Sequence, residues 1–190
     1  MKGDACFSPD RKYRYMLSRT WADGFLTCLF ICLNASTADA ERNDPTITRG
    51  VGFARDWGFS RLLWTNIFGL RSNDPKRLYS DSDPIGPEND TWIMKSALES
   101  DFIVVGWGEH GVYRNRGRAV LEMLNAPAVI SRAGRPHCFA LNKSGQPRHP
   151  LYLPRTARPE MVSTEWLGWK REELRTPEMF KKMYMGEFLC

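Results

Sequence analysis

The sequence predicts an α/β fold, a three-layer α/β/α domain built on a mostly parallel central sheet. Three apolar stretches, at residues 25–33, 61–68 and 102–108, are rich in residues that favour strands, and each ends in a polar or glycine-containing loop. Segments with helical character separate these stretches, and strands that alternate with helices favour parallel pairing. Open α/β sheets hold their functional groups at the carboxyl ends of such strands.

Length and composition predict one domain that covers residues 1–190. The chain has 190 residues, of which 42% are hydrophobic and 12% aromatic, so it can fill one core but has no room for a second domain. No apolar run approaches the roughly 20 residues of a membrane helix. Charged residues also interrupt the N-terminus before a secretory signal could form. We therefore expect a cytoplasmic monomer with no membrane partner.

The order of elements follows from local signals. Residues 1–24 alternate imperfectly, which indicates a strand or hairpin at the edge of the sheet. Asp44 and Pro45 are typical of a helix start, and this helix extends to about Trp57, before Gly58. The other expected elements are a long binding or mobile connection at 69–87, a helix at 88–100, a basic helix at 113–124 with its arginines facing outward, short strands at 128–130 and 137–141, a tight turn at 143–147 and a helical segment at 160–190.

The five cysteines indicate core packing. Only Cys28 and Cys32 lie close in sequence, and their even spacing within a predicted strand places both on one face of it. This is not the turn spacing of a metal site, so we prefer reduced core thiols over a metal or iron–sulfur centre. We expect no metal and no cofactor.

Positive charge is concentrated in one part of the chain. Residues 111–158 contain nine Lys or Arg and a single acidic residue, whereas the rest of the chain is slightly acidic. A segment this unbalanced favours a polyanionic partner, and nucleic acid is our expectation. The candidate DNA contacts are Arg114, Arg116, Arg118, Lys143, Arg148 and Arg155.

Four loop segments should meet at the carboxyl edge of the sheet: residues 34–39, Asn66, residues 108–110 and residues 148–150. They supply amides, carboxylates and histidines, whereas the chain contains neither a Gly-x-Ser-x-Gly elbow nor a phosphate-binding loop. Structural alternatives remain open for several of these groups. Asn66 could bond to backbone, His110 could hydrogen-bond a turn, and Asp44 could serve only as a helix N-cap.

In this order, four motifs resemble those of the uracil-DNA glycosylase superfamily, in its mismatch-specific branch. They are Leu33-Asn34-Ala35-Ser36, Leu63-Trp64-Thr65-Asn66, Trp107-Gly108-Glu109-His110 and His149-Pro150-Leu151. The whole chain also resembles a family of uncharacterised bacterial and phage proteins that look like antiphage DNA glycosylases. The resemblance implies a uracil-DNA-glycosylase-like fold and a monofunctional DNA glycosylase that acts on double-stranded DNA and leaves an abasic site.

The resemblance also implies roles for individual residues. Asn34 positions water, Asn66 reads a pyrimidine edge, and His149 donates a hydrogen bond to the departing base, while Asp39 or Asp44 activates the water. Ser36, Thr37, Phe53 and His110 complete the substrate contacts, although Phe53 and Trp57 at helical spacing also fit the core. The family's Tyr that blocks bulky pyrimidines is missing after the first motif. We therefore expect a modified base, such as glucosylated 5-hydroxymethylcytosine in phage DNA.

Two other classes of function remain open. A non-catalytic nucleic-acid-binding module fits the basic segment equally well, although it does not require converging Asn and His residues. A hydrolase of free modified nucleotides would use the same residues, but it needs less positive charge than the chain carries. Residues 34–49 contain no lysine, so we do not expect a Schiff-base lyase.

Overall fold

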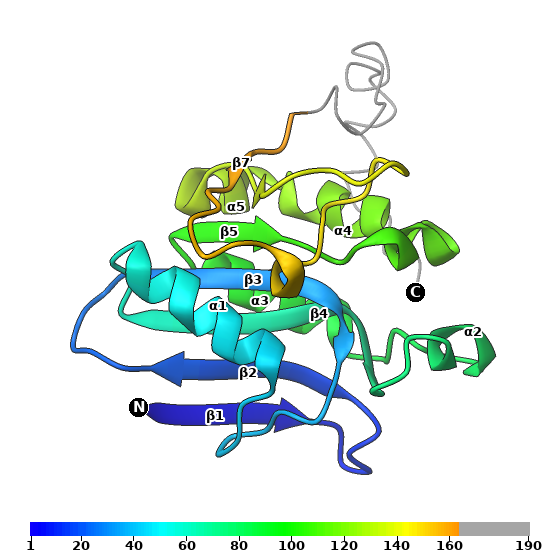
Figure 1. The fold of residues 1–190 in the computed structure, drawn as a ribbon. Coiled ribbons are helices and arrows are strands. Elements are labelled where there is room, and N and C mark those ends of the chain that lie inside the picture. The colour runs from blue at the N-terminus through cyan, green and yellow to red at the C-terminus, as the bar shows by residue number, and fades with distance from the viewer. Residues whose placement is uncertain (164–190) are drawn as a thin grey trace.

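The computed structural model describes residues 1–163, in which a seven-stranded sheet has the order β1-β2-β4-β3-β5-β6-β7 (Figure 1). The long central strands β3 and β4 are those that the apolar stretches predict, and both end at a later residue than predicted. The strands are β1 Lys2–Phe7, β2 Arg14–Thr20, β3 Thr27–Ala35, β4 Arg61–Arg71, β5 Phe102–Val105, β6 His137–Cys138 and β7 Glu160–Met161.

The sheet is mixed, which corrects the prediction of mostly parallel pairing. Strands β4, β3, β5 and β6 are parallel neighbours, whereas β1 with β2, β2 with β4 and β6 with β7 are antiparallel. Strands β1 and β2 are joined by a tight turn in which Ser8 N–H donates to the Tyr13 carbonyl, and so short a connection permits only antiparallel pairing. The general α/β class and the N-terminal edge hairpin are confirmed.

Helices cover both faces of the sheet (Figure 1). Helix α1 packs on one face, and α3, α4 and α5 pack on the other. The helices are α1 Pro45–Asp56, α2 Arg77–Ser80, α3 Asn89–Leu98, α4 Arg116–Leu124 and α5 Pro127–Ala133, with 3-10 turns η1 Glu109–Asn115 and η2 Pro150–Tyr152. None of the helices in residues 1–163 is long and apolar enough to cross a bilayer.

The core under α1 is aromatic and tightly packed. Phe30 of β3 stacks on Trp64 of β4 with ring centroids 5.1 Å apart. Gly50 lets the helix approach this pair, because a Cβ there would meet the Trp64 ring at 2.3 Å. Cys28 and Cys32 are free thiols buried in the same cluster, as the strand spacing predicts.

Four local predictions differ from the structure. Residues 128–130 belong to helix α5, because Pro127 occupies its first turn and Val129 is buried in the core on the face of the sheet that α3, α4 and α5 cover. The basic helix begins at Arg116, after two residues in the left-handed region. The strand at 137–141 shortens to β6, and the predicted segment at 160–190 begins with β7, while residues 164–190 lie outside the described residues.

Candidate functional site

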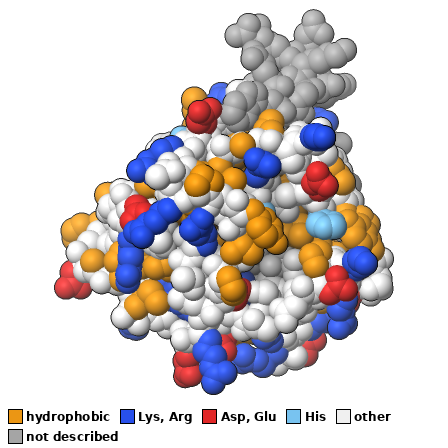
Figure 2. Space-filling model, viewed as in Figure 1, with side chains coloured by type: hydrophobic (Ala, Val, Ile, Leu, Met, Phe, Trp, Pro, Cys, Tyr) orange, Lys and Arg blue, Asp and Glu red, His pale blue; other side chains and the backbone are white. Residues whose placement is uncertain are grey.

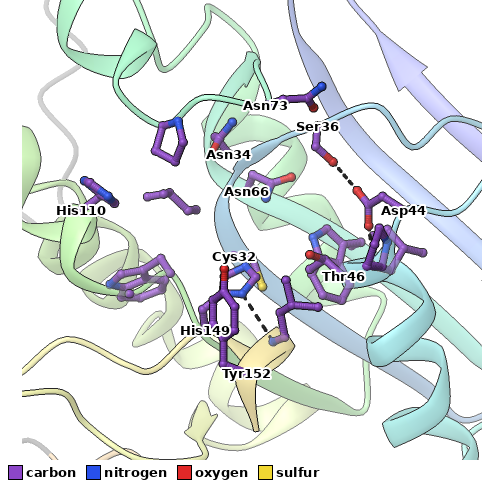
Figure 3. A pocket seen from close by; sticks show the side chains of 18 of the residues that line it. Cys32, Asn34, Ser36, Asp44, Thr46, Asn66, Asn73, His110, His149 and Tyr152 are labelled. Atoms are coloured by element: carbon purple, nitrogen blue, oxygen red, sulfur yellow. Dashed lines mark hydrogen bonds between the residues drawn. The ribbon is translucent and has the colours of Figure 1, made fainter.

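A cavity of about 730 Å³ opens where the ends of several elements meet (Figure 3). The end of β3, the middle of β4 and the N-terminus of α1 form its walls, together with the loop after β5 and residues 148–153. Asn34, Asn66 and His149 all line it, although they come from segments far apart in sequence. In Figure 3 these three side chains face one space, with Asp44 on one side and His110 on the other.

Asn34 is fixed by the backbone around it. Its Nδ2 donates to the Ser72 carbonyl at 2.7 Å and to the Ala35 carbonyl at 3.0 Å, at a point where the pairing of β3 with β4 shifts register. Its Oδ1 has no donor among residues 1–163, and it belongs to a side chain that lines the cavity. Asn34 therefore offers an acceptor to the cavity, which suits the positioning of water.

Asn66 lies inside β4 and not at its end, since the strand continues to Arg71. It is 1% exposed, and its Oδ1 accepts a hydrogen bond from Arg14 Nη2 at 3.3 Å. The bond to Arg14 uses one of the two lone pairs of this oxygen and leaves Nδ2 free to donate. Asn66 can therefore donate to an acceptor on a ligand, and its reading of a pyrimidine edge stays a prediction.

Asp44 has a structural role and a place at the cavity. As the N-cap of α1, its Oδ1 accepts from Ile47 N at 2.7 Å, as the sequence predicts. Its Oδ2 accepts a hydrogen bond from the Ser36 hydroxyl, and both residues line the cavity (Figure 3). Asp44 and Glu109 are the carboxylates among the cavity residues that the structure describes, and of the two Asp44 is the one predicted from the sequence.

Asp39 does not reach the cavity, contrary to the prediction. Its carboxylate accepts from the backbone N–H groups of Glu41 and Arg42, at 2.9 and 2.8 Å, and these bonds lower its pKa. The chain turns back on itself at this point, so the Asp39 side chain closes a local turn. Of the two carboxylates expected at the site, only Asp44 is present.

His149 is held as a neutral donor. Burial lowers its pKa to about 4, against an opposing effect of the Asp44 charge. Its Nδ1 accepts from Leu151 N at 3.4 Å and so caps the short turn η2. Because Nδ1 accepts, the single proton of the neutral ring lies on Nε2, which can donate a hydrogen bond to a ligand.

The other predicted ligand contacts divide into two groups. Thr37 and His110 line the cavity, and His110 Nδ1 lies 2.6 Å from the hydroxyl of Tyr79 on α2. Phe53 does not line it; its ring is 1% exposed and packs 5.5 Å from that of Trp57 under α1. Phe53 lies eight residues beyond Pro45, about 12 Å along the helix from the end that faces the cavity.

Sequence reasoning missed several residues of the cavity, Arg14 and Tyr152 among them. Arg14 on β2 is 2% exposed, and burial lowers its pKa to about 10. Tyr152, which lines the cavity next to His149, is 84% exposed. An arginine between Tyr13 and Tyr15 in an alternating apolar segment is the signal that could have indicated a buried charge.

The predicted DNA contacts are mostly engaged within the protein. Arg116 is buried, donates from Nε to the Ile67 carbonyl at 2.7 Å and pairs with Asp90, which contradicts its predicted outward position. The other pairs are Arg118 with Glu122, Arg155 with Asp56 and Arg114 with the Ser82 carbonyl. The face seen in Figure 2 accordingly mixes blue, red and orange side chains.

Two of the six candidate contacts remain exposed with no ion pair among residues 1–163. They are Lys143, in the turn at 143–147, and Arg148, which lines the cavity. The tight turn itself is confirmed, with Gly145 in the left-handed region and Asn142 N–H donating to the Gln146 carbonyl. Available positive charge is therefore smaller than the sequence count, and part of it lies at the cavity.

Fold and site together define an α/β protein with a cavity of mixed polar and apolar lining beside the carboxyl ends of its central strands. Residues 14–151 match the model of a family described as a protein of unknown function, DUF1643, and the chain belongs to that family. No curated protein and no solved structure matches the chain. The matched segment runs from Arg14 to Leu151 and so contains each of the cavity residues discussed above except Tyr152.

Proposed function

We propose that this protein is a monofunctional DNA glycosylase that hydrolyses the N-glycosidic bond of a modified pyrimidine flipped out of DNA. One observation carries the proposal: Asn34, Asn66 and His149, from three separate segments, line a single cavity. Its volume of about 730 Å³ lies within the range of small-molecule sites. A base that is held in such a cavity must leave the duplex, as in other enzymes that act on DNA bases.

The residues divide the reaction between the two ends of the breaking bond. The bond from C1′ to N1 breaks with its electron pair passing to the base, while the oxygen of water bonds to C1′. One hydrogen of the water stays on the new sugar hydroxyl, and the other ends on the released base. His149 Nε2–H stabilises the departing base by a hydrogen bond, and Asn34 Oδ1 accepts one from the attacking water. Asp44 is a carboxylate that can receive the second proton of this water before that proton passes to the released base.

The substrate class follows from space and from the resemblance. No tyrosine follows the first motif to restrict the base, since the sequence there is Asn34-Ala35-Ser36-Thr37. We therefore propose a hypermodified pyrimidine, with glucosylated 5-hydroxymethylcytosine of phage DNA as the specific candidate and defence against phage as the biological role. The exposed Arg148 at the cavity supplies a contact for the phosphate backbone.

A second candidate is a hydrolase of free modified nucleotides. The internal pairing of Arg116, Arg118 and Arg155 favours it, because those charges are less available to a long polyanion. The same catalytic groups would serve. The two candidates differ in whether base release requires a polymer.

The experiment supplies both kinds of substrate. Duplex oligonucleotides with one cytosine, 5-hydroxymethylcytosine, glucosylated 5-hydroxymethylcytosine or uracil, and the matching free nucleotides, are incubated with the protein. Mass spectrometry identifies released bases, and alkali treatment reveals abasic sites. We expect release from the glucosylated duplex, with strand cleavage only after alkali. Release from free nucleotides alone favours the second candidate, and no release from any substrate overturns both.

A further inference from the structure

Arg14 is a buried cation without a carboxylate partner. Its guanidinium donates from Nη1 to the Ala38 carbonyl at 2.8 Å and from Nη2 to Asn66 Oδ1 at 3.3 Å. Its Nε–H has no acceptor among residues 1–163, and no acidic side chain in that range lies within ion-pair distance. Both partners are neutral, so the charge of Arg14 is left uncompensated by contact.

A second buried arginine shows the ordinary arrangement. Arg116 is 4% exposed, and its guanidinium pairs with Asp90 in addition to its bond to the Ile67 carbonyl. Burial of a charge is unfavourable unless that charge is paired, and Arg116 follows the rule. Arg14 and Arg19 both lack a carboxylate partner among residues 1–163, but every guanidinium nitrogen of Arg19 donates to a carbonyl or amide oxygen. Arg14 differs from both other arginines because its Nε–H has no acceptor and because it lines the cavity.

The groups around Arg14 favour a negative or acceptor-bearing ligand. Arg19 and Arg71 add positive charge near it, and Asp44 adds negative charge. Both carboxylate oxygens of Asp44 already accept hydrogen bonds, from Ser36 and from Ile47 N. The bond between Arg14 and Asn66 turns the Asn66 amide so that its Nδ2–H₂ is the free end. The two side chains therefore form one donor surface.

We propose that Arg14 binds the anionic form of the pyrimidine ring, and so takes the charge that passes to the base when its glycosidic bond breaks. This rests on the proposed glycosylase function and names the chemical class of the leaving group: an oxo-pyrimidine whose N1 electron pair is delocalised onto its O2 carbonyl. Arg14 and Asn66 Nδ2 supply donors for such a planar edge. His149 donates from another part of the cavity wall.

A planar ring fits these surroundings better than a phosphate. The wall of the cavity that Arg14 lines also includes Cys32, Trp64 and Ile47, which are apolar or aromatic. A phosphate has four oxygens in a tetrahedron and is normally held by several N–H groups or by more than one cation. Arg14 and Asn66 offer fewer donors than that, and they are joined in one surface.

Direct binding of free pyrimidines to the full chain tests the proposal. The probes are 5-nitrouracil, which is an anion at neutral pH, and thymine, which has a similar size but is neutral there. Isothermal titration compares wild type with Arg14→Gln, Arg14→Lys and the matched buried control Arg116→Gln. Thermal melting establishes that each variant is folded. Inorganic phosphate serves as the third probe.

We expect wild type to bind 5-nitrouracil about 10- to 100-fold more tightly than thymine, as one charge-assisted hydrogen-bonding group would give. Arg14→Gln should abolish this preference, whereas Arg14→Lys and Arg116→Gln should keep most of it. Equal binding of the two probes by wild type overturns the proposal, and so does an unchanged preference in folded Arg14→Gln. Phosphate binding as tight as that of 5-nitrouracil, lost in Arg14→Gln, also overturns it in favour of a phosphate site.

Base release separates this inference from the proposed function. If the protein prefers the anion through Arg14 but releases no base from any DNA or nucleotide, the anion site stands and the glycosylase proposal fails. If Arg14→Gln releases base at the wild-type rate, the glycosylase proposal stands and the role of Arg14 fails. If both proposals hold, Arg14→Gln should release base about 100-fold or more slowly than wild type.

Discussion

The polar groups of the cavity and those of the basic segment at residues 111–158 differ in how fully they are paired within the protein. In the basic segment, Arg116 and Arg155 are paired with carboxylates from distant parts of the chain. At the cavity, Asn34, Asn66 and His149 each use one hydrogen-bonding group to hold position and keep another for a ligand. The arginines of the basic segment are thus satisfied within the protein, whereas the cavity side chains are held in place with one hydrogen-bonding group still unused.

The difference shows what a charge count can and cannot indicate. The nine basic residues of the segment predict a polyanion partner only if their charges reach the surface. Several instead pair with carboxylates inside the protein, whereas Arg14, a buried cation whose Nε–H has no acceptor among residues 1–163, lies outside the segment. Two cations, the buried Arg14 and the exposed Arg148, therefore lie at the cavity itself. Mutation and pH can test this contrast at four levels of effect.

The largest effect is expected at the cavity. Asn34→Ala and His149→Ala should each lower base release about 100- to 1,000-fold, since each removes a group aimed at the reacting atoms. DNA binding should change only a few-fold. Asn125→Ala, which removes an amide at the C-terminal end of α4 that does not line the cavity, is the matched control. Full activity in both cavity variants would remove these residues from the mechanism.

The neutral state of His149 should appear in the pH dependence of stability. Its pKa is about 4 in the folded protein and near 6.5 when unfolded, so the unfolded chain binds a proton first as pH falls. Stability should drop by about 3 kcal/mol between pH 6.5 and 4. Urea unfolding across this range should show a smaller drop for His149→Gln, although His137, whose pKa is also lowered by burial, retains its part. Identical profiles would place His149 in contact with solvent.

The ion pairs of the basic segment should differ in strength according to burial. Asp90→Asn leaves the buried Arg116 without its charged partner, and we expect a loss of about 2 kcal/mol, less than for a fully buried pair because Asp90 is half exposed. Asp56→Asn removes the partner of Arg155, which is 71% exposed, and should change the urea midpoint less than Asp90→Asn does, because solvent screens an exposed pair. Urea midpoints measure both, and equal losses would contradict the contrast.

The smallest effect concerns salt. Arg148 is exposed without an ion pair among residues 1–163, so Arg148→Ala should weaken DNA binding and reduce the slope of log affinity against log salt by about 1. Arg155 is already paired with Asp56, so Arg155→Ala should change that slope less. Titration of duplex DNA at several salt concentrations measures the slopes. A larger change for Arg155 would show that its internal pair opens on DNA.

Local signals predicted much of the fold. Asp44 and Pro45 begin α1 where expected, and the apolar stretches at 25–33 and 61–68 become β3 and β4. The failures occur where tertiary contacts override local preference. Val129 has a strand-forming side chain but packs as part of helix α5. The antiparallel edges of the sheet likewise depend on connection length and partner, which periodicity does not encode.

By itself the sequence determined the α/β class, the capped start of α1 and the polar residues within and after the buried strands, because each of these depends on neighbours within one or two turns of chain. Only the tertiary structure decided which charges are compensated. Arg14 meets Asn66 across 52 residues, Arg116 meets Asp90 across 26, and Arg155 meets Asp56 across 99. Desolvation and pairing depend on distance in space, so the sequence does not distinguish an arginine that pairs with a carboxylate from one that lines the cavity without such a partner.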